Sequence, residues 1–273
     1  MLRVRSDALL GDDEGRRWFR GQLFHGLAYE VEADGRVAGL VSMVAGRAAD
    51  PSSDWLPLPP GGVRADRASL EMAGDYGPWT WLGLPVCGVV YSFAVDGTCS
   101  VEETFDDGLP DDRGRRAWYG SGAPNILVEQ AGSTVWFEDG SVRTRRIDDV
   151  LLLNLIVSEQ GWLRGIVLKG ASLLDVDSIA RRPFAAKLLL LGAGVDDALL
   201  ARLAALASFR DVQRLAVTET ALGRAAVDVL ASAERLLSVT LEGNAGLGSI
   251  EAERLRALRP EMMVELRGSV DEG

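Results

Sequence analysis

His25 is the only histidine in the chain, so a Ser-His-Asp triad or a Cys-His pair could use no other residue. It lies in the stretch LFHGLAYEV, whose apolar, strand-prone neighbours favour a structural imidazole over a general base. A structural zinc site needs four ligands of the Cys or His type. The chain has only three such residues, His25, Cys87 and Cys99, and they are scattered. We therefore expect no catalytic residue, no metal and no cofactor.

Carboxylates are concentrated in one stretch, which contains Glu102, Glu103, Asp106, Asp107, Asp111 and Asp112. Their oxygens could hold a hard cation, but the spacing differs from the D-x-D-x-D-G loop of EF-hand sites, so a solvated loop is the favoured interpretation. Two carboxylates of this half could also form a glycosidase pair, with tryptophans as platforms for sugar rings. Such pairs are inevitable in a chain with 40 acidic residues, however, and tryptophans more often fill a β core.

Two glycine-rich stretches superficially match motifs of nucleotide-binding proteins and hydrolases. GNAGLGS, residues 243–249, lacks the Lys-Ser/Thr ending of a phosphate-binding loop. GSGAP, residues 120–124, lacks the G-x-S-x-G spacing of a nucleophile elbow and precedes a strand pattern instead of a helix. Neither stretch indicates an enzyme.

The formal charge of −11 is unevenly distributed along the chain. Residues 1–160 hold 15 basic and 25 acidic side chains, whereas residues 161–273 hold 14 and 15. An acidic surface repels phosphate backbones and anionic lipids, so we expect neither nucleic acid nor membrane as a partner. A basic protein remains a possible partner. Apolar runs such as Val150 to Val157 are shorter than the roughly 20 residues of a membrane span. Because the N-terminus also lacks a signal-peptide pattern, we expect a cytoplasmic protein.

The first half of the chain is punctuated by three turn signals, Asp34-Gly35, Asp96-Gly97 and Asp139-Gly140, each between β-branched and aromatic residues. Such dipeptides are typical of β-hairpins. A two-residue turn at the second signal would place Cys99 opposite Ala94 and far from Cys87, so no disulfide is expected. The spacings of 62 and 43 residues are too unequal for propeller blades. The Pro- and Gly-rich segment DPSSDWLPLPPGGVRAD should be a surface loop, and so should FDDGLPDDRGRR.

After Trp162 the chain changes character, and leucine and alanine dominate. Five segments share an apolar-x-apolar triplet, and the triplets end at Leu168, Leu191, Val217, Leu241 and Leu266, in steps of 23, 26, 24 and 25 residues. Each triplet is followed three residues later by a small or polar residue: Ala171, Gly194, Thr220, Asn244 and Ser269. Helical patterns separate the segments, in DDALLARLAALASF with Asp196 or Asp197 as N-cap, GRAAVDVLASAERLL and SIEAERLRAL.

These segments resemble the leucine-rich repeat family, through its L-x-L-x-x-N core followed by a helix, over roughly residues 163–270. The family usually has Asn or Cys after the strand, where the side chain bonds backbone groups of the adjacent turn, and only Asn244 fits. Ala171 and Gly194 cannot make that bond. The resemblance therefore implies a short arc with a parallel sheet on its concave face and helices on its convex face.

Together these patterns predict an α+β protein with a β-rich domain over residues 1–160 and a short leucine-rich-repeat-like domain over residues 161–273. The favoured function is a non-enzymatic protein–protein interaction module, a bacterial adaptor or an inhibitor of another protein, binding through the concave face, the acidic β domain or both. The candidate partner-binding residues are Lys169, Arg214, Thr218, Thr240, Glu242, Glu265 and Arg267. The alternative is a hydrolase or carbohydrate-binding protein that uses carboxylates and tryptophans of the first domain.

Overall fold

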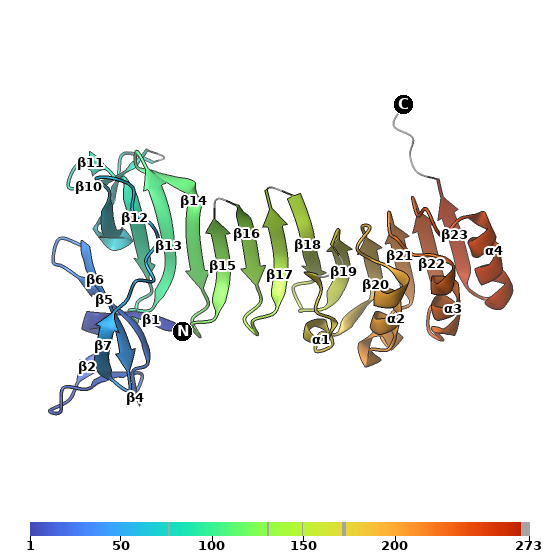
Figure 1. Ribbon diagram of the computed structural model, residues 1–273, viewed down its shortest axis with the longest axis horizontal. Helices are drawn as coiled ribbons and strands as arrows, with labels where there is room; N and C mark the ends of the chain where they lie inside the picture. Colours follow the sequence, from blue (N-terminus) through green and yellow to red (C-terminus); the bar gives the residue numbers. More distant parts are fainter. Residues whose placement is uncertain (76, 130, 149, 171–172, 269–273) are drawn as a thin grey trace. The chain divides into compact units, whose positions relative to one another are not determined.

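A computed structural model of the chain describes residues 1–75, 77–129, 131–148, 150–170 and 173–268, without the side chains of Asp50, Asp112 and Arg113. The chain folds as two compact units, Met1–Val142 and Arg143–Gly273 (Figure 1). Both are rich in strand, and among the described residues the helices of two or more turns all belong to the second unit, so the protein is of the α+β class. The division lies after Val142, so the antiparallel strand segments over residues 143–147 and 150–157 belong to the second unit by their contacts. No helix in the described ranges is long and apolar enough to cross a membrane.

The first unit consists of short strands in antiparallel hairpins, with two parallel pairs. One sheet has the order β1-β5-β6-β7, two small sheets contain β2-β3-β4 and β9-β10-β11, and a further set pairs in the order β8-β12-β13-β14-β15-β16. The strands are β1 (Leu2–Arg5), β2 (Leu10–Gly11), β3 (Arg17–Phe19), β4 (Gln22–Leu23), β5 (Gly26–Val31), β6 (Val37–Val44), β7 (Arg47–Pro51), β8 (Val63–Asp66), β9 (Glu71–Met72), β10 (Trp79–Trp81), β11 (Leu84–Pro85), β12 (Gly88–Phe93), β13 (Cys99–Asp106), β14 (Leu109–Trp118), β15 (Pro124–Glu129) and β16 (Gly132–Trp136).

The predicted hairpins at Asp34-Gly35 and Asp96-Gly97 are confirmed, and they join β5 to β6 and β12 to β13. Their geometry differs from a two-residue turn, because Ala94 and Thr98 close a three-residue loop and the φ of Gly97 is 84°. The expected pairing of Cys99 with Ala94 is therefore wrong, and Cys99 lies opposite Phe93. Both cysteines are free, Cys87 exposed and Cys99 buried. A type I turn followed by a left-handed glycine is the usual three-residue solution, and only glycine adopts that conformation without strain.

The acidic stretch that the sequence analysis interpreted as a loop instead forms most of the hairpin β13–β14. Asp106 pairs with Leu109, and the φ angles of Asp107 and Gly108 are 48° and 76°, so the loop is only two residues long. Two consecutive residues with positive φ make the turn that matches strand twist, which explains why the chain reverses here. The Pro- and Gly-rich segment is irregular over residues 52–62, as predicted, but its last four residues form β8, and Leu56 is buried, so it is not a surface loop throughout.

Two successive segments of the first unit have the same strand arrangement. In the first copy β1 pairs in parallel with β5, and β5, β6 and β7 follow as antiparallel neighbours. In the second copy β8 pairs in parallel with β12, and β12, β13 and β14 follow in the same way. Equivalent residues such as Tyr29 and Tyr91 are 62 residues apart. The spacing between the first two Asp-Gly turns therefore marks a tandem duplication, which the sequence analysis did not recognise.

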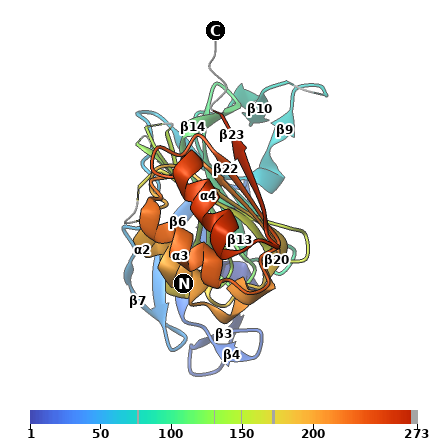
Figure 2. The ribbon, with the colours of Figure 1, turned by 90° about the vertical axis from the view of Figure 1, so that its right-hand side faces the viewer.

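The second unit begins with antiparallel strands and continues with parallel strand–helix units. β17, β18 and β19 are antiparallel neighbours, and β19 to β23 form parallel pairs in chain order. Figure 2 shows α2, α3 and α4 stacked on one side of these parallel strands. The elements are β17 (Val142–Ile147), β18 (Val150–Val157), β19 (Leu163–Leu168), α1 (Val176–Ile179), β20 (Phe184–Leu191), α2 (Asp197–Ala204), β21 (Arg214–Thr218), α3 (Arg224–Ser232), β22 (Ser238–Glu242), α4 (Ser249–Leu258) and β23 (Met263–Arg267).

The three predicted helical segments are confirmed as α2, α3 and α4. Asp196 is the N-cap of α2, and its carboxylate accepts a hydrogen bond of 2.8 Å from the Leu199 backbone N–H. In α4 the side chain of Glu251 accepts a hydrogen bond of 3.1 Å from the Gly248 backbone N–H. Both contacts satisfy donors that a helix start leaves without intrahelical partners.

The predicted register of the second triplet is wrong by one residue. Leu190 pairs with Val217, and Leu191 pairs with Thr218. Leu188 and Leu190 are therefore the buried pair of β20, with Leu190 fully buried, while Leu189 and Leu191 lie on the opposite face and are only partly buried. Because β-strand side chains alternate between faces, a run of four leucines fits either register equally well. The continuous apolar row is Ile166, Leu190, Val217 and Leu241, each at most 1% exposed, and it ends at Leu266.

Candidate functional site

The side of β19 to β23 opposite the helices, termed the open face, carries two rows of side chains in register. One row contains Gly165, Leu189, Ala216, Thr240 and Glu265. The other contains Val167, Leu191, Thr218, Glu242 and Arg267. Both rows change from apolar to polar and charged between β20 and β22. Strands in neighbouring pairs lie about 4.8 Å apart, so side chains in each row are immediate neighbours.

Six of the seven residues predicted from the sequence come together on this open face. They are Arg214, Thr218, Thr240, Glu242, Glu265 and Arg267, all in strands β21 to β23 and all at least partly exposed. Lys169 follows the end of β19, where it is exposed and its backbone N–H donates to the Leu152 carbonyl at 2.9 Å. It therefore lies outside the paired strands.

Charges on the open face are partly neutralised. Glu265 and Arg267 form an ion pair of 3.0 Å, and the hydrogen bond from Arg267 lowers the pKa of the Glu265 carboxyl. The Thr240 hydroxyl donates to the same carboxylate at 3.5 Å. Arg214 has no ion-pair partner among the described residues, so its guanidinium is available to a carboxylate from another molecule.

Asn244 links the turns at the ends of neighbouring strands through side-chain hydrogen bonds. Its side-chain amide donates to the Val217 carbonyl at 2.8 Å. Its side-chain oxygen accepts from the backbone N–H of Thr220 at 2.9 Å and from the Thr220 hydroxyl at 2.7 Å. The backbone N–H of Gly194 donates directly to the Leu168 carbonyl at 2.8 Å instead. The corresponding positions Ala171 and Ser269 lie outside the described residues.

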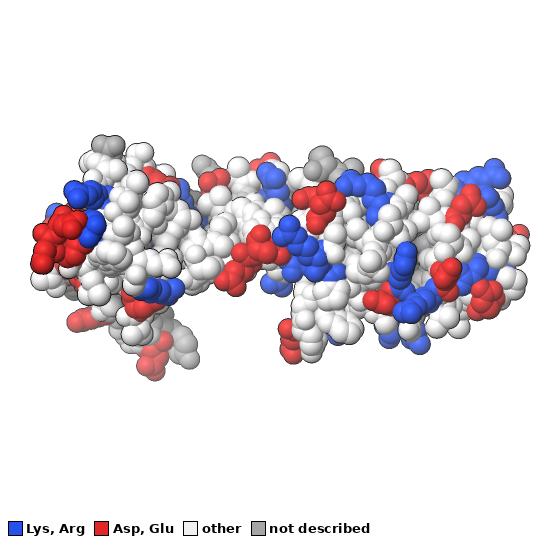
Figure 3. All heavy atoms as spheres, turned by 90° about the horizontal axis from the view of Figure 1, so that it is seen from below, with Lys and Arg blue, Asp and Glu red and all other residues white. Residues whose placement is uncertain are grey.

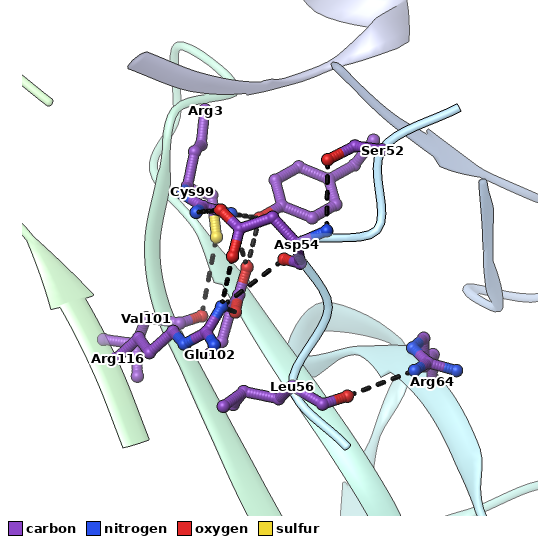
Figure 4. A network of polar contacts seen from close by, with 10 residues as sticks. Arg3, Ser52, Asp54, Leu56, Arg64, Cys99, Val101, Glu102 and Arg116 are labelled. Atoms are coloured by element: carbon purple, nitrogen blue, oxygen red, sulfur yellow. Dashed lines mark hydrogen bonds and ion pairs between the residues drawn. The ribbon is translucent and has the colours of Figure 1, made fainter. Parts of the chain in front are cut away.

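A buried charged cluster in the first unit was not predicted from the sequence (Figure 4). Arg3, 8% exposed, donates to the Tyr29 hydroxyl at 2.9 Å and to the Glu102 carboxylate at 3.1 Å. The Tyr29 hydroxyl donates to the same carboxylate, and Glu102 is only 1% exposed. The guanidinium of Arg3 also lies over the Trp118 ring, 4.4 Å from its centroid. Each buried charge thus has close partners, as a low-dielectric setting requires, although Arg3 Nε and Glu102 Oε2 have no hydrogen-bond partner among the described residues.

The cluster continues outward to the irregular segment between β7 and β8. Asp54 accepts hydrogen bonds from Arg3 and, at 2.9 Å, from Arg116. Two residues further, the Leu56 carbonyl accepts from Arg64 at 3.1 Å. Asp54 is half exposed, whereas Leu56 is buried. The cluster therefore fastens a segment outside the strands, whose start is also held by a hydrogen bond of 2.8 Å from the Ser52 backbone N–H to the Leu40 carbonyl of β6.

Burial dominates the ionisation of this cluster. Desolvation raises the pKa of Glu102, although the neighbouring Arg3 opposes the shift. Desolvation also raises the pKa of the Tyr29 phenol and of the Cys99 thiol. A raised pKa keeps the thiol protonated and inert. Because Glu102 and Cys99 are both closed off from solvent, the geometry fits a structural role better than substrate chemistry.

Tryptophans of the first unit are mostly covered by arginines. Guanidinium groups lie 4.4 to 5.7 Å from the ring centroids of Trp18, Trp55, Trp79 and Trp118. Such stacking occupies the ring face that a sugar would need. His25 is exposed between β4 and β5, and its imidazole has no hydrogen bond to the part of the chain that the structure describes. No group of metal-ligating side chains occurs among the described residues. These positions do not assemble a catalytic site.

Comparison with known proteins does not assign the chain to a family. No protein-family model matches the chain, and no curated protein matches it.

Proposed function

We propose that the protein is a non-enzymatic interaction module that binds another protein through the open face of β19 to β23. The observation that carries the proposal is the pair of polar rows on this face, from Thr240 to Glu265 and from Thr218 to Arg267, which no described helix covers. Parallel strands hold these side chains at fixed spacing, so the surface is rigid before a partner arrives. A preorganised surface loses little conformational entropy on binding.

The leucine-rich repeat resemblance supports the same conclusion and is also a proposal. The strand–helix units and the hydrogen bonds of Asn244 fit a short arc of that family, with the open face on its concave side. Proteins of this architecture use the concave side as a binding surface. The helices α2 to α4 carry side chains of both signs and offer no single-sign patch, and Figure 3 shows Lys and Arg interspersed with Asp and Glu at this end of the chain as seen from below. An adaptor or an inhibitor of another protein would fit.

The acidic net charge bears on the class of partner. Since the excess of acidic residues lies in residues 1–160, that half would attract a basic protein and repel nucleic acid and anionic membranes. We propose a protein partner, with the acidic half steering a basic region of it and the open face making the specific contacts.

The test is a triple charge reversal on the open face, Arg214→Glu, Glu242→Lys and Arg267→Glu. The immobilised wild type and variant are compared by quantitative mass spectrometry for proteins that they capture from their native lysate. A matched control carries the same charge changes on exposed helix positions, Arg202→Glu, Arg224→Glu and Glu253→Lys. We expect a partner that the wild type and the control retain and that the open-face variant loses. Equal capture by all three proteins would falsify the proposal.

A further inference from the structure

A hollow of about 690 Å³ lies at the edge of the open face where the parallel strands begin. The residues around it include Trp162, Arg164, Lys187 and Leu189. They come from the turn after β18 and from the strands β19 and β20, so all of them belong to the second unit. These residues are spread over two strands and a turn, so no sequence motif marks the region.

The floor of the hollow is apolar and accessible. Trp162 is 49% exposed, although tryptophan is large and apolar enough to favour burial. Leu189 lines the hollow together with the small apolar side chains of Ala185 and Ala186. Exposed tryptophans beside apolar floors are typical centres of binding energy in interfaces.

The rim of the hollow is positively charged. Arg164 and Lys187 line it, and no Asp or Glu is among its lining residues. Neither cation forms an ion pair with a residue that the structure describes. Lys187 also lies directly opposite Arg214 on the neighbouring strand. Like charges opposite each other destabilise a sheet, and an anion from a partner would relieve that repulsion.

We propose that this hollow binds an extended acidic segment of the partner protein, with an apolar side chain against Trp162 and flanking carboxylates on Arg164 and Lys187. The inference rests on the proposed function, because the hollow is part of the open face. The second half of the chain is nearly neutral, with 14 basic and 15 acidic residues in 161–273, so it does not repel an acidic segment. The apolar floor favours a peptide over a nucleic acid, whose binding would depend mainly on phosphate contacts.

Fluorescence anisotropy with defined peptides tests the proposal. The probe is a fluorescein-labelled peptide of alternating Glu and Leu with about seven residues, which spans roughly 23 Å when extended. Matched peptides replace every Glu by Lys or every Leu by Ser, and a labelled single-stranded oligonucleotide tests phosphate binding. We expect the Glu-Leu peptide to bind best, and Arg164→Glu with Lys187→Glu to weaken it by about tenfold or more. Trp162→Ala should weaken it as well.

The control is the double variant Arg202→Glu and Arg224→Glu, which changes the net charge equally on the helix side. Both altered pairs are exposed, and urea unfolding verifies that each variant is folded. Unchanged binding by the hollow variant, equal weakening by the control, a preference for the Lys-Leu peptide or the oligonucleotide, or no binding would each overturn the proposal. If the peptide test fails but partner capture still depends on Arg214, Glu242 and Arg267, only the proposal of an acidic segment in the hollow is refuted. If peptide binding does not depend on the hollow and partner capture does not depend on the open face, the proposed function is refuted too.

Discussion

Buried polar side chains are unevenly divided between the two units. Among the described residues, Arg3, Asp66, Thr98 and Glu102 are buried in the first unit, and only Thr220 is buried in the second. The first unit connects short strands and irregular segments, which leave many groups to be fixed by side chains. The second unit repeats one strand–helix arrangement, in which stacked aliphatic side chains are sufficient.

The duplication inside the first unit shows how local this difference is. Tyr29 pairs with Leu40 in the first copy, and Tyr91 pairs with Glu102 at the equivalent position of the second. Leu40 is 3% exposed and Glu102 is 1% exposed, so the same backbone buries an aliphatic side chain in one copy and a carboxylate in the other. Burying a charge costs desolvation free energy, which only close partners offset. We infer that the charge is kept because it fastens the segment around Asp54.

The largest expected effect comes from breaking the buried cluster on one side. Arg3→Ala leaves the buried Glu102 carboxylate with only the more distant Arg116, at 3.9 Å, as a cation, which should lower the free energy of unfolding by about 3–5 kcal/mol. Urea unfolding followed by tryptophan fluorescence measures this change in the first unit, since six of the seven tryptophans lie there.

Replacing the whole cluster sharpens the comparison between the two copies. The triple variant Arg3→Met, Glu102→Leu and Tyr29→Phe removes the charges and the hydroxyl together and gives the second copy the aliphatic residue of the first. We expect the triple variant to be as stable as the wild type or more stable, with a gain in unfolding free energy of up to about 4 kcal/mol.

For the single variant Arg3→Ala, a loss below about 1 kcal/mol, the value of an exposed ion pair, would contradict the account of a buried charge.

The second unit should be most sensitive along its apolar row. Leu190→Ala creates a cavity in that row and should cost about 2–5 kcal/mol. Leu191→Ala changes a partly exposed neighbour on the open face, and we expect a much smaller loss. Far-UV circular dichroism in urea measures both variants, and equal losses would contradict the register described above.

These two leucines also show what could be predicted from the sequence. The helices α2 to α4, an N-cap at Asp196 or Asp197, and the polar open-face residues of β21 to β23 were predicted, because the spacing of polar and apolar residues is clear there. The run of leucines in β20 has no polar residue to mark either face, so periodicity alone could not determine its register. The register of β20 is determined only by its hydrogen-bonded pairing with the neighbouring strands β19 and β21.

The charged cluster could not be predicted for a different reason. Arg3 and Glu102 are 99 residues apart in the sequence. An acidic residue that is flanked by other acidic residues is also expected to be exposed to solvent. One signal was available in the sequence. Aligning the chain with itself at the spacing of the first two Asp-Gly turns would have placed Glu102 on Leu40 and indicated that the carboxylate faces the core.

A smaller effect is expected from the polar link in the second unit. Asn244→Ala removes the acceptor for the Thr220 N–H and the donor to the Val217 carbonyl, which should cost about 1–3 kcal/mol. Amide hydrogen exchange of Thr220 should accelerate at the same time. Thr240→Ala, on the open face of the same strand–helix unit, is the control and should change stability by about 0.5 kcal/mol or less. If the two variants lose equal stability, Asn244 does not link the turns energetically.

The smallest expected effect concerns pH, and it compares the wild type with Glu102→Gln. Burial raises the pKa of Glu102 in the folded state above its ordinary value of 4.5. The folded protein therefore holds this proton more tightly than the unfolded chain, so the contribution is present at low pH and is lost as pH rises through the folded pKa. The wild type should lose unfolding free energy relative to Glu102→Gln as pH rises from the ordinary carboxyl range through the raised pKa of folded Glu102. Urea unfolding across this range measures the difference. The opposite result would be an unfolding free energy of the wild type that increases relative to Glu102→Gln as pH rises. It would mean that attraction to Arg3 outweighs desolvation. The buried carboxylate would then stabilise the first unit much as the aliphatic row stabilises the second.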